Sequence, residues 1–148
     1  MSLFEQINSD LKVAMKSGDK VRVEVLRFSL AGLNAAQKEK GIKEPGATLI
    51  DEEVIAALQK EAKKRKESIE LFRQGKRDDL VQKEEGDLAI IMGYLPKEMS
   101  REEIEKIVLD LKNKGFTEFN TLMREAMKVL KGRADGKLVG EVVKASIG

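Results

Sequence analysis

Basic side chains are concentrated between Lys60 and Arg77, where they could bind the phosphates of a nucleic acid. This window holds eight basic and three acidic side chains, a net charge of +5, whereas the whole chain carries +2. Binding to phosphates releases counterions and therefore depends strongly on salt. The alternative interpretation is a solvated helix face with ion pairs four residues apart, such as Lys63 with Glu67. The site residues expected in this window are Lys60, Lys63, Lys64, Arg65, Lys66 and Arg77.

Arg65 differs from its basic neighbours because it lies on the apolar line of the helix expected around it. That line steps by three or four residues and includes Leu58 and Ile69, so Arg65 shares their face. A charged group on a buried line is costly unless it is paired. We therefore favour a packed side chain whose guanidinium reaches Glu61 or Asp87. Direct contact with a ligand is the alternative.

A second basic cluster surrounds the loop from Gly132 to Gly136, just before the last expected helix. A helix N-terminus presents unpaired amide groups and favours anions, so a phosphate could dock at this loop. The simpler interpretation is that Gly132 closes one helix and Asp135 caps the next. The site residues expected here are Lys128, Lys131, Arg133 and Lys137.

The chain contains no cysteine and no histidine, which removes most enzymatic chemistry. Disulfides, zinc sites built from these residues, cysteine nucleophiles and histidine-based triads are excluded. Most acidic clusters lie in expected first turns of helices, where they favour the helix dipole. Glu84, Glu85 and Asp87 could bind a cation, but their spacing does not demand one. We therefore expect no catalytic residue, no metal and no cofactor.

Aromatic residues are scarce, with five phenylalanines, one tyrosine and no tryptophan. Proteins that read single-stranded RNA usually stack its bases on aromatic side chains. Phe28, Phe72 and Phe119 fall where a core is expected, and Tyr94 is expected to pack with its hydroxyl at the surface. Any nucleic-acid binding is therefore expected to follow shape and backbone charge, not base sequence.

Helical patterns run along the whole chain, and strand patterns are nearly absent. Capping boxes open two expected helices, at Ser2 with Glu5 and at Ser100 with Glu103. Apolar residues recur at helical spacing in each segment, although the alternation around residues 23–25 also fits a short strand. We expect a first helix to about residue 17 and a second, capped by Asp19, to about residue 40. A long third helix is expected over residues 51–74. A fourth helix follows, capped by Asp78 or Asp79 and stopped before residue 96.

Pro96 marks the expected boundary between two parts, because proline cannot continue the preceding helix. Residues 1–96 are expected to form an N-terminal helical domain of about four helices, one of them long. Residues 97–148 are expected to form a small C-terminal three-helix bundle, which makes the fold class all-α. A bundle of ~50 residues is marginal alone, so we expect it to pack on the first unit or on a partner.

No charge-free apolar stretch approaches the ~20 residues that a membrane-spanning helix needs. The N-terminus carries acidic residues early and lacks the apolar region of a secretory signal peptide. We therefore expect a cytoplasmic protein without membrane contact.

Several motifs together resemble the GatB/YqeY-like family. They are KKRKES at residues 63–68, GKRDDLV at 75–81, YLP at 94–96 and GRADGKLV at 132–139. Their order and spacing agree with the family over nearly the whole chain. The chain departs from the family pattern at Arg124, where the family often has glycine, and at Asp87, where it often has glutamate. The first departure adds a basic contact or alters the packing of the C-terminal bundle.

The resemblance implies an all-helical protein similar to the tail of the B subunit of the glutamine-dependent aspartyl/glutamyl-tRNA amidotransferase. The same unit is appended to some glutaminyl-tRNA synthetases, and in both settings it helps to hold tRNA. The chain would then assist a carbon–nitrogen ligase that uses glutamine as amido donor, without catalysing the reaction itself. Its implied partners are tRNA and an amidotransferase or aminoacyl-tRNA synthetase. A module that docks on such an enzyme without touching RNA is the alternative, and a free-standing enzyme is the third hypothesis.

Overall fold

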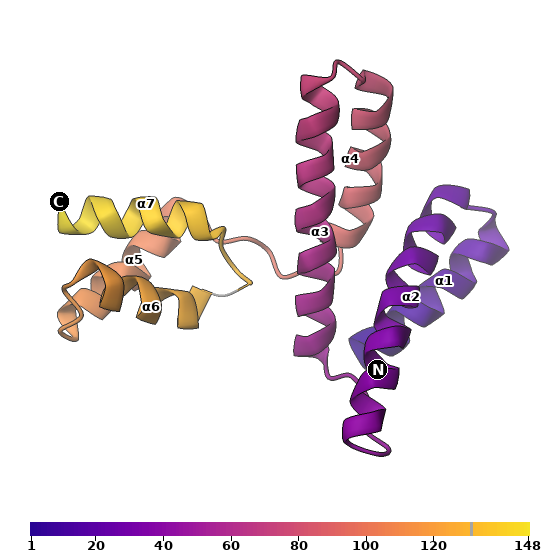
Figure 1. Ribbon diagram of the computed structural model, residues 1–148, viewed down its shortest axis with the longest axis horizontal. Coiled ribbons are helices and arrows are strands. Elements are labelled where there is room, and N and C mark those ends of the chain that lie inside the picture. Colours follow the sequence, from indigo (N-terminus) through magenta and orange to yellow (C-terminus); the bar gives the residue numbers. More distant parts are fainter. Residues whose placement is uncertain (131) are drawn as a thin grey trace. The chain divides into compact units, whose positions relative to one another are not determined.

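The computed structural model describes residues 1–130 and 132–148, and in these residues the regular secondary structure consists of helices without strands, which confirms the predicted all-α class (Figure 1). Contacts divide the chain into two compact units, Met1–Leu95 (unit 1) and Pro96–Gly148 (unit 2). The helices in the described ranges are α1 Leu3–Ser17, α2 Lys20–Lys43, α3 Asp51–Gln74, α4 Asp78–Met92, α5 Arg101–Asn113, α6 Phe119–Leu130 and α7 Gly136–Ile147.

Short-range signals set both ends of α1. The Ser2 hydroxyl accepts the amide hydrogen of Glu5 (3.1 Å), and the Glu5 carboxylate accepts that of Ser2 (3.2 Å). Gly18 ends the helix with a φ of 75°, a left-handed conformation that glycine adopts without strain. Asp19 then caps α2 by accepting the amide of Arg22. The predicted capping box and the predicted turn are both confirmed.

The C-terminal end of α2 differs from the prediction. The sequence predicts an end at Gly41, but α2 continues to Lys43 and is capped by Glu44. Glu44 has φ −131° and ψ 89°, a non-helical geometry, and proline disfavours helical geometry in the residue before it. Pro45 therefore ends the helix, and Gly41 is a tolerated glycine in its last turns.

The start of α4 also differs from the prediction. The helix begins at Asp78 with Arg77 as its N-cap, so Asp78 and Asp79 lie in the first turn instead of capping it. There the two carboxylates interact favourably with the helix dipole. Lys76, with a φ of 56°, reverses the chain just before the helix. α4 ends at Met92, and the amides of Tyr94 and Leu95 donate to the carbonyls of Ile91 and Met92, a tighter turn that precedes Pro96, as predicted for a helix stopped before residue 96.

Unit 1 consists of two helical hairpins, in which α1 pairs with α2 and α3 pairs with α4. Figure 1 shows the two hairpins close together near the loop that joins α2 to α3 and farther apart at their opposite ends. All four helices contribute to one core. Its buried members are Ile7, Val25, Leu26, Leu30, Leu33, Leu49, Val54, Leu58, Ala62 and Ile91.

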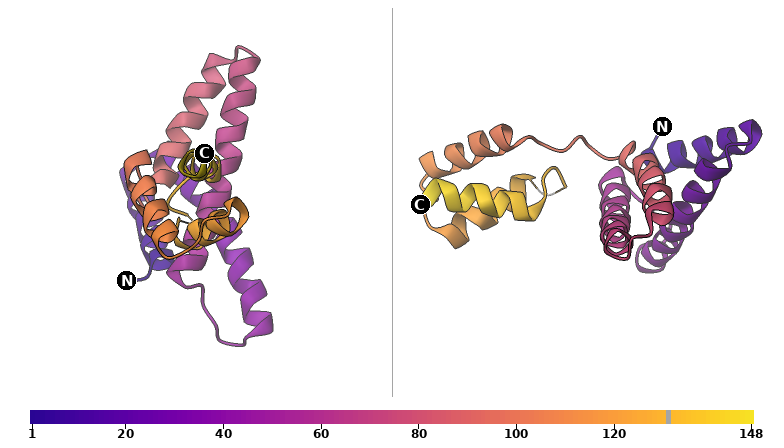
Figure 2. Two further views of the ribbon diagram at one scale, coloured as in Figure 1. Left: turned by 90° about the vertical axis from the view of Figure 1, so that its left-hand side faces the viewer. Right: turned by 90° about the horizontal axis from the view of Figure 1, so that it is seen from above.

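Unit 2 packs its three helices around a core of its own (Figure 2). α5 opens with Ser100 as N-cap, whose hydroxyl accepts the amide of Glu103, as predicted. The amide of Met99 donates to the carbonyl of Arg133 (2.8 Å), which ties the start of this unit to the loop before α7. The buried members of the core are Ile104, Val108, Leu111, Leu122, Ala126, Leu130, Val139, Val142 and Val143.

In the described residues, none of the helices is both long enough and apolar enough to cross a lipid bilayer.

Candidate nucleic-acid interface

Arg65 lies at the centre of a cluster of carboxylates supplied by α3 and α4. Its Nε donates to Glu61 Oε2 at 3.2 Å, and its Nη1 contacts Glu84 Oε2 at 3.0 Å and Asp87 Oδ2 at 3.3 Å. The Arg65 side chain is only 14% exposed. The interpretation that a packed Arg65 reaches Glu61 or Asp87 is therefore confirmed, with Glu84 as a further partner. Its guanidinium holds α3 to α4.

Further contacts join α2 and the rest of α4 to this cluster. The Ser29 hydroxyl on α2 donates to Glu61 Oε1 at 2.8 Å. Lys83 Nζ donates to Asp87 Oδ2 at 3.2 Å, and this bond raises the pKa of the Lys83 ammonium. Glu85 pairs with Arg73 at 3.1 Å. Glu84, Glu85 and Asp87 thus bind basic side chains, and in the described residues no group of acidic side chains is arranged to hold a metal ion.

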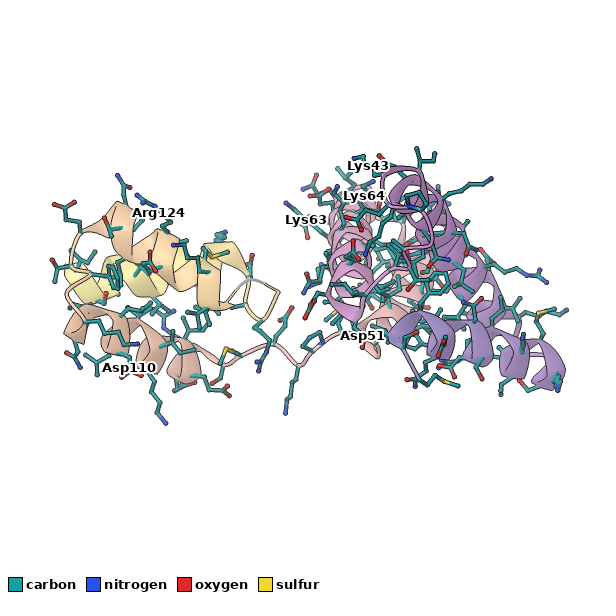
Figure 3. The ribbon with its side chains drawn as sticks, turned by 90° about the horizontal axis from the view of Figure 1, so that it is seen from below. Lys43, Asp51, Lys63, Lys64, Asp110 and Arg124 are labelled. Atoms are coloured by element: carbon teal, nitrogen blue, oxygen red, sulfur yellow. The ribbon has the colours of Figure 1, made fainter. Side chains whose placement is uncertain are left out.

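Three exposed lysines on α3, Lys60, Lys63 and Lys64, form the surface that we call the lysine ridge. Their spacing places them on neighbouring positions of one side of the helix. Within the part of the chain that the structure describes, none of the three forms an ion pair, and the Lys63–Glu67 pair suggested by the sequence is not made. Figure 3 shows Lys63 and Lys64 at the surface of unit 1. Lys66 is also exposed, but it interacts with neighbouring groups.

One acidic neighbour of the lysine ridge, Glu61, is already bound by other groups. Glu61 lies within one helical turn of Lys60 and Lys64, yet its two carboxylate oxygens bind Arg65 and Ser29. In the described residues the three lysines thus form no ion pair, and their side chains are exposed to solvent. Exposed cations of this kind are suited to phosphate groups, and phosphate binding by these three residues stays a prediction.

Phe28 contradicts the prediction that it belongs to the core, because its residue is 64% exposed. The buried residues of α2 are Val25, Leu26, Ser29, Leu30 and Leu33. At ~100° per residue, Phe28 lies about 130° from the centre of that face. The helical wheel could therefore have shown its exposure, and the hydrophobicity of the residue concealed it. Phe119 was expected in the core as well, and it is 43% exposed.

The ring of Phe28 is covered on one side by a cation. Arg65 Cζ lies 5.4 Å from the ring centroid, within the distance of a cation–π interaction. Because carboxylates fix the guanidinium, the contact also orients the ring.

Beside Phe28, the surface between α2 and α3 is hollowed. This hollow, which we call the α2–α3 hollow, has a volume of about 340 Å³. Its walls are small or apolar side chains from the two helices, and two members of the lysine ridge complete it. The lining includes Phe28, Ala31, Gly32, Ala57, Lys60 and Lys64.

Arg77, also predicted as a site residue, forms a two-point contact with Asp79 at the start of α4. Its Nε lies 3.3 Å from Oδ1 and its Nη2 lies 3.2 Å from Oδ2. The contact raises the pKa of Arg77 and lowers that of Asp79. Both side chains are largely exposed, so Arg77 stays accessible while its charge is partly offset.

The predicted residues of unit 2 surround the start of α7. Lys128 pairs with Glu125 at 3.0 Å, whereas Arg133 and Lys137 are exposed. Asp135 caps α7 by accepting the amide of Lys137. Lys131 lies outside the described residues.

The loop that precedes α7 follows the simpler of its two interpretations. Gly132 has a φ of 81°, and the Asp135 carboxylate occupies the helix N-terminus. The cap predicted at Asp135 is therefore confirmed, and Gly132 has the left-handed backbone that glycine adopts readily after a helix. Arg124, the departure from the family pattern, is exposed on α6, where it adds a basic side chain without disturbing the core (Figure 3).

The chain is similar to several fungal proteins. A protein of Pyrenophora tritici-repentis, named altered inheritance of mitochondria protein 41, mitochondrial, is 31% identical over 153 residues, which cover 99% of this chain and 81% of that protein. An uncharacterized protein of Schizosaccharomyces pombe is 35% identical over 94 residues, 64% of this chain and 72% of its own length. A Lachancea thermotolerans protein with the first name is 36% identical over 89 residues, 60% of this chain and 46% of that protein.

The names of these relatives contradict the predicted cytoplasmic location. The relatives from Pyrenophora, Lachancea and Saccharomyces cerevisiae are named mitochondrial proteins. The prediction rested on the lack of long apolar segments. Mitochondrial transit peptides are amphipathic and arginine-rich, so a search for apolar segments does not bear on that compartment. The cytoplasmic prediction is therefore wrong.

The family resemblance read from the motifs is confirmed. The model of the family described as Yqey-like protein matches residues 4–147. The match runs from the first turn of α1 to the last residue of α7, so it includes both units. This chain is a member of the YqeY-like protein family.

Proposed function

We propose that this chain is a non-catalytic tRNA-binding accessory protein of tRNA-dependent amidation or aminoacylation. Membership of the YqeY-like family supports the proposal through the resemblance to the tail of the tRNA amidotransferase B subunit. In this role the chain holds tRNA for a carbon–nitrogen ligase that takes its amide from glutamine. The chemistry is performed by the partner enzyme, either an amidotransferase or an aminoacyl-tRNA synthetase.

The observation that carries the proposal is the lysine ridge. In the part of the chain that the structure describes, three exposed lysines of one helix form no ion pair, and the nearby Glu61 carboxylate is bound to Arg65 and Ser29. A solvated helix face normally alternates its charges and pairs them four residues apart. Unpaired cations on one surface instead favour an extended anion, and the phosphate backbone of a folded RNA is such a partner.

Affinity for tRNA measured as a function of salt tests the proposal. For a variant with Lys60→Gln, Lys63→Gln and Lys64→Gln, we expect weaker tRNA binding. The salt slope, which is the slope of the logarithm of the binding constant against the logarithm of the salt concentration, should fall in magnitude by roughly 2 to 3, because each lost phosphate contact removes about 0.9. The matched control changes Lys12, Lys16 and Lys20 to glutamine, because these are also exposed lysines of unit 1. Equal effects of the two triple variants would contradict a role specific to the ridge.

Duplex DNA of matched length separates RNA recognition from general attraction between charges. Tighter binding to tRNA that persists at physiological salt supports the proposal. Equal binding to both nucleic acids that disappears with salt would mean counterion release alone. Capture of an amidotransferase or synthetase that survives ribonuclease treatment, without any tRNA affinity, would replace the proposal by docking on the enzyme.

A further inference from the structure

We propose that the α2–α3 hollow receives one unpaired nucleobase of the bound RNA, stacked on the ring of Phe28, while Lys60 and Lys64 hold the adjoining phosphates. The inference rests on the proposed function and adds a contact with a base to the contacts with the backbone. The sequence alone argued against such a contact, because it placed Phe28 in the core.

The aromatic platform is the first support. Phe28 is 64% exposed. Stacking of a base on an exposed aromatic ring removes apolar surface from water and stabilises the complex. Arg65 lies over the ring, and its guanidinium is itself fixed by Glu61, Glu84 and Asp87. The ring is therefore held in place before any ligand binds, which lowers the entropic cost of binding.

The space beside the ring is the second support. The hollow has a volume of about 340 Å³, within the range of small-molecule sites and large enough for a nucleoside. It stays open because Ala31 and Gly32 are small, and a Cβ built on Gly32 would meet no atom within 4 Å. Leu33 and Leu58 are buried beneath it and provide an apolar floor. An apolar lining accepts the face of a base without selecting its identity.

The charge around the hollow is the third support, and it identifies a nucleotide as the occupant. Lys60 and Lys64 are one helical turn apart at the rim, and Figure 3 shows Lys64 at the surface of α3. Glu61 is the acidic residue among the lining groups, and its carboxylate is bound to Ser29 and Arg65. The rim thus presents two free positive charges beside an aromatic face. This combination suits a base with its phosphates better than an apolar peptide helix.

Replacement of Phe28 gives the main test, with tRNA as the probe. For Phe28→Ala we expect affinity to fall by roughly 5- to 100-fold, as for the loss of one base–aromatic stack, with an unchanged salt slope. The matched control is Phe119→Ala, because Phe119 is an exposed phenylalanine of unit 2. Unchanged affinity of the Phe28 variant would overturn the inference.

A spectroscopic test is available because the chain has no tryptophan. Phe28→Trp should keep its affinity for tRNA, and its fluorescence should be quenched when a base stacks on the new ring. Phe119→Trp provides the control, whose fluorescence should change little. Binding of tRNA without quenching of the tryptophan at position 28 would overturn the inference.

Filling the hollow tests the same site without touching the ring. Gly32→Leu should lower tRNA affinity, whereas Gly86→Leu on α4, another helical glycine with open space around it, should not. If the wild-type protein does not bind tRNA, the proposed function and the inference are both overturned. Wild-type binding that needs the lysine ridge but is unaffected by Phe28→Ala and Gly32→Leu would overturn the inference alone.

Discussion

At Arg65, a single guanidinium group offsets the charge of carboxylates from two helices. Asp87 is 4% exposed, so its charge is largely removed from water and depends on Arg65 and Lys83 for compensation. The planar group also reaches Glu61 and Glu84 at hydrogen-bonding distance, which suits its fixed arrangement of donors. The basic motif of this sequence therefore contains two kinds of residue: one that organises the fold and lysines that face solvent.

Removal of Arg65 should destabilise unit 1 strongly. We expect Arg65→Met to lower the free energy of unfolding by about 3 kcal/mol or more, because it leaves buried carboxylates without their partner. Arg65→Lys should recover part of the loss, since one ammonium cannot reproduce the contacts of the planar fork. Urea unfolding followed by circular dichroism measures both variants.

The control for this experiment is Arg77→Met, which breaks an ion pair between side chains that are 58% and 67% exposed. Exposed pairs typically contribute ~0–1 kcal/mol, so this variant should remain close to the wild type. Equal stability of the Arg65 and Arg77 variants would show that the buried cluster does not hold α3 to α4.

Tyr94 makes the stability of unit 1 dependent on pH in the alkaline range. Its hydroxyl donates to Asp10 Oδ2 at 2.6 Å, and burial together with this carboxylate raises the pKa of the phenol. A raised pKa means that the folded state keeps the proton after the unfolded state has lost it. The stabilising contribution is therefore complete below pH ~10, the ordinary tyrosine pKa, and is lost as pH rises above it.

This behaviour can be followed at one residue, because Tyr94 is the single tyrosine of the chain. Ultraviolet absorbance should show ionisation of the phenol above its ordinary range in the folded protein and at its ordinary pKa in urea. Tyr94→Phe should cost about 1.5 to 3 kcal/mol near neutral pH, the typical contribution of a hydrogen bond to a charged group. A titration at the ordinary pKa in the folded protein would contradict the assigned contact.

At the scale of the elements, local signals predicted the helices well. The capping box at Ser2 and the N-cap at Ser100 are determined by residues three positions apart, so they can be read from the sequence, although Glu103 contacts the Ser100 hydroxyl and does not complete a box. The predicted end of α2 was wrong because two residues that can end a helix, Gly41 and Pro45, lie close together. The helix continues past Gly41 and ends just before Pro45. A proline constrains the residue before it sterically, whereas a glycine only weakens a helix.

The site could be predicted only in part, because its main features depend on contacts between elements. Asp87 was predicted as a partner of Arg65, but Glu84, which lies 19 positions from Arg65 along the chain, was not, because this contact depends on how α3 and α4 pack. The contact between Ser29 and Glu61 likewise depends on the packing of α2 against α3 and could not be read from the sequence. Phe28, in contrast, was misplaced for a local reason, since its position on the wheel of α2 already separates it from the buried face.

At the scale of the whole molecule, each unit carries its own hydrophobic core, and this makes a prediction about unfolding. Leu122 is fully buried in the core of unit 2, and Leu122→Ala should cost about 2 to 5 kcal/mol. A unit of ~50 residues has a small free energy of unfolding, so this change should largely unfold it. Unit 1 has a separate core and should remain folded.

Two spectroscopic signals distinguish the units in this experiment. Near-ultraviolet circular dichroism of Tyr94 reports on unit 1, and far-ultraviolet ellipticity reports on the helices of both. In Leu122→Ala, part of the ellipticity should be lost while the Tyr94 signal and its urea midpoint stay unchanged. Leu109→Ala is the control, because Leu109 is 56% exposed and such changes usually alter stability by no more than ~0.5 kcal/mol. Loss of the Tyr94 signal together with the ellipticity would mean that the two cores unfold as one cooperative structure.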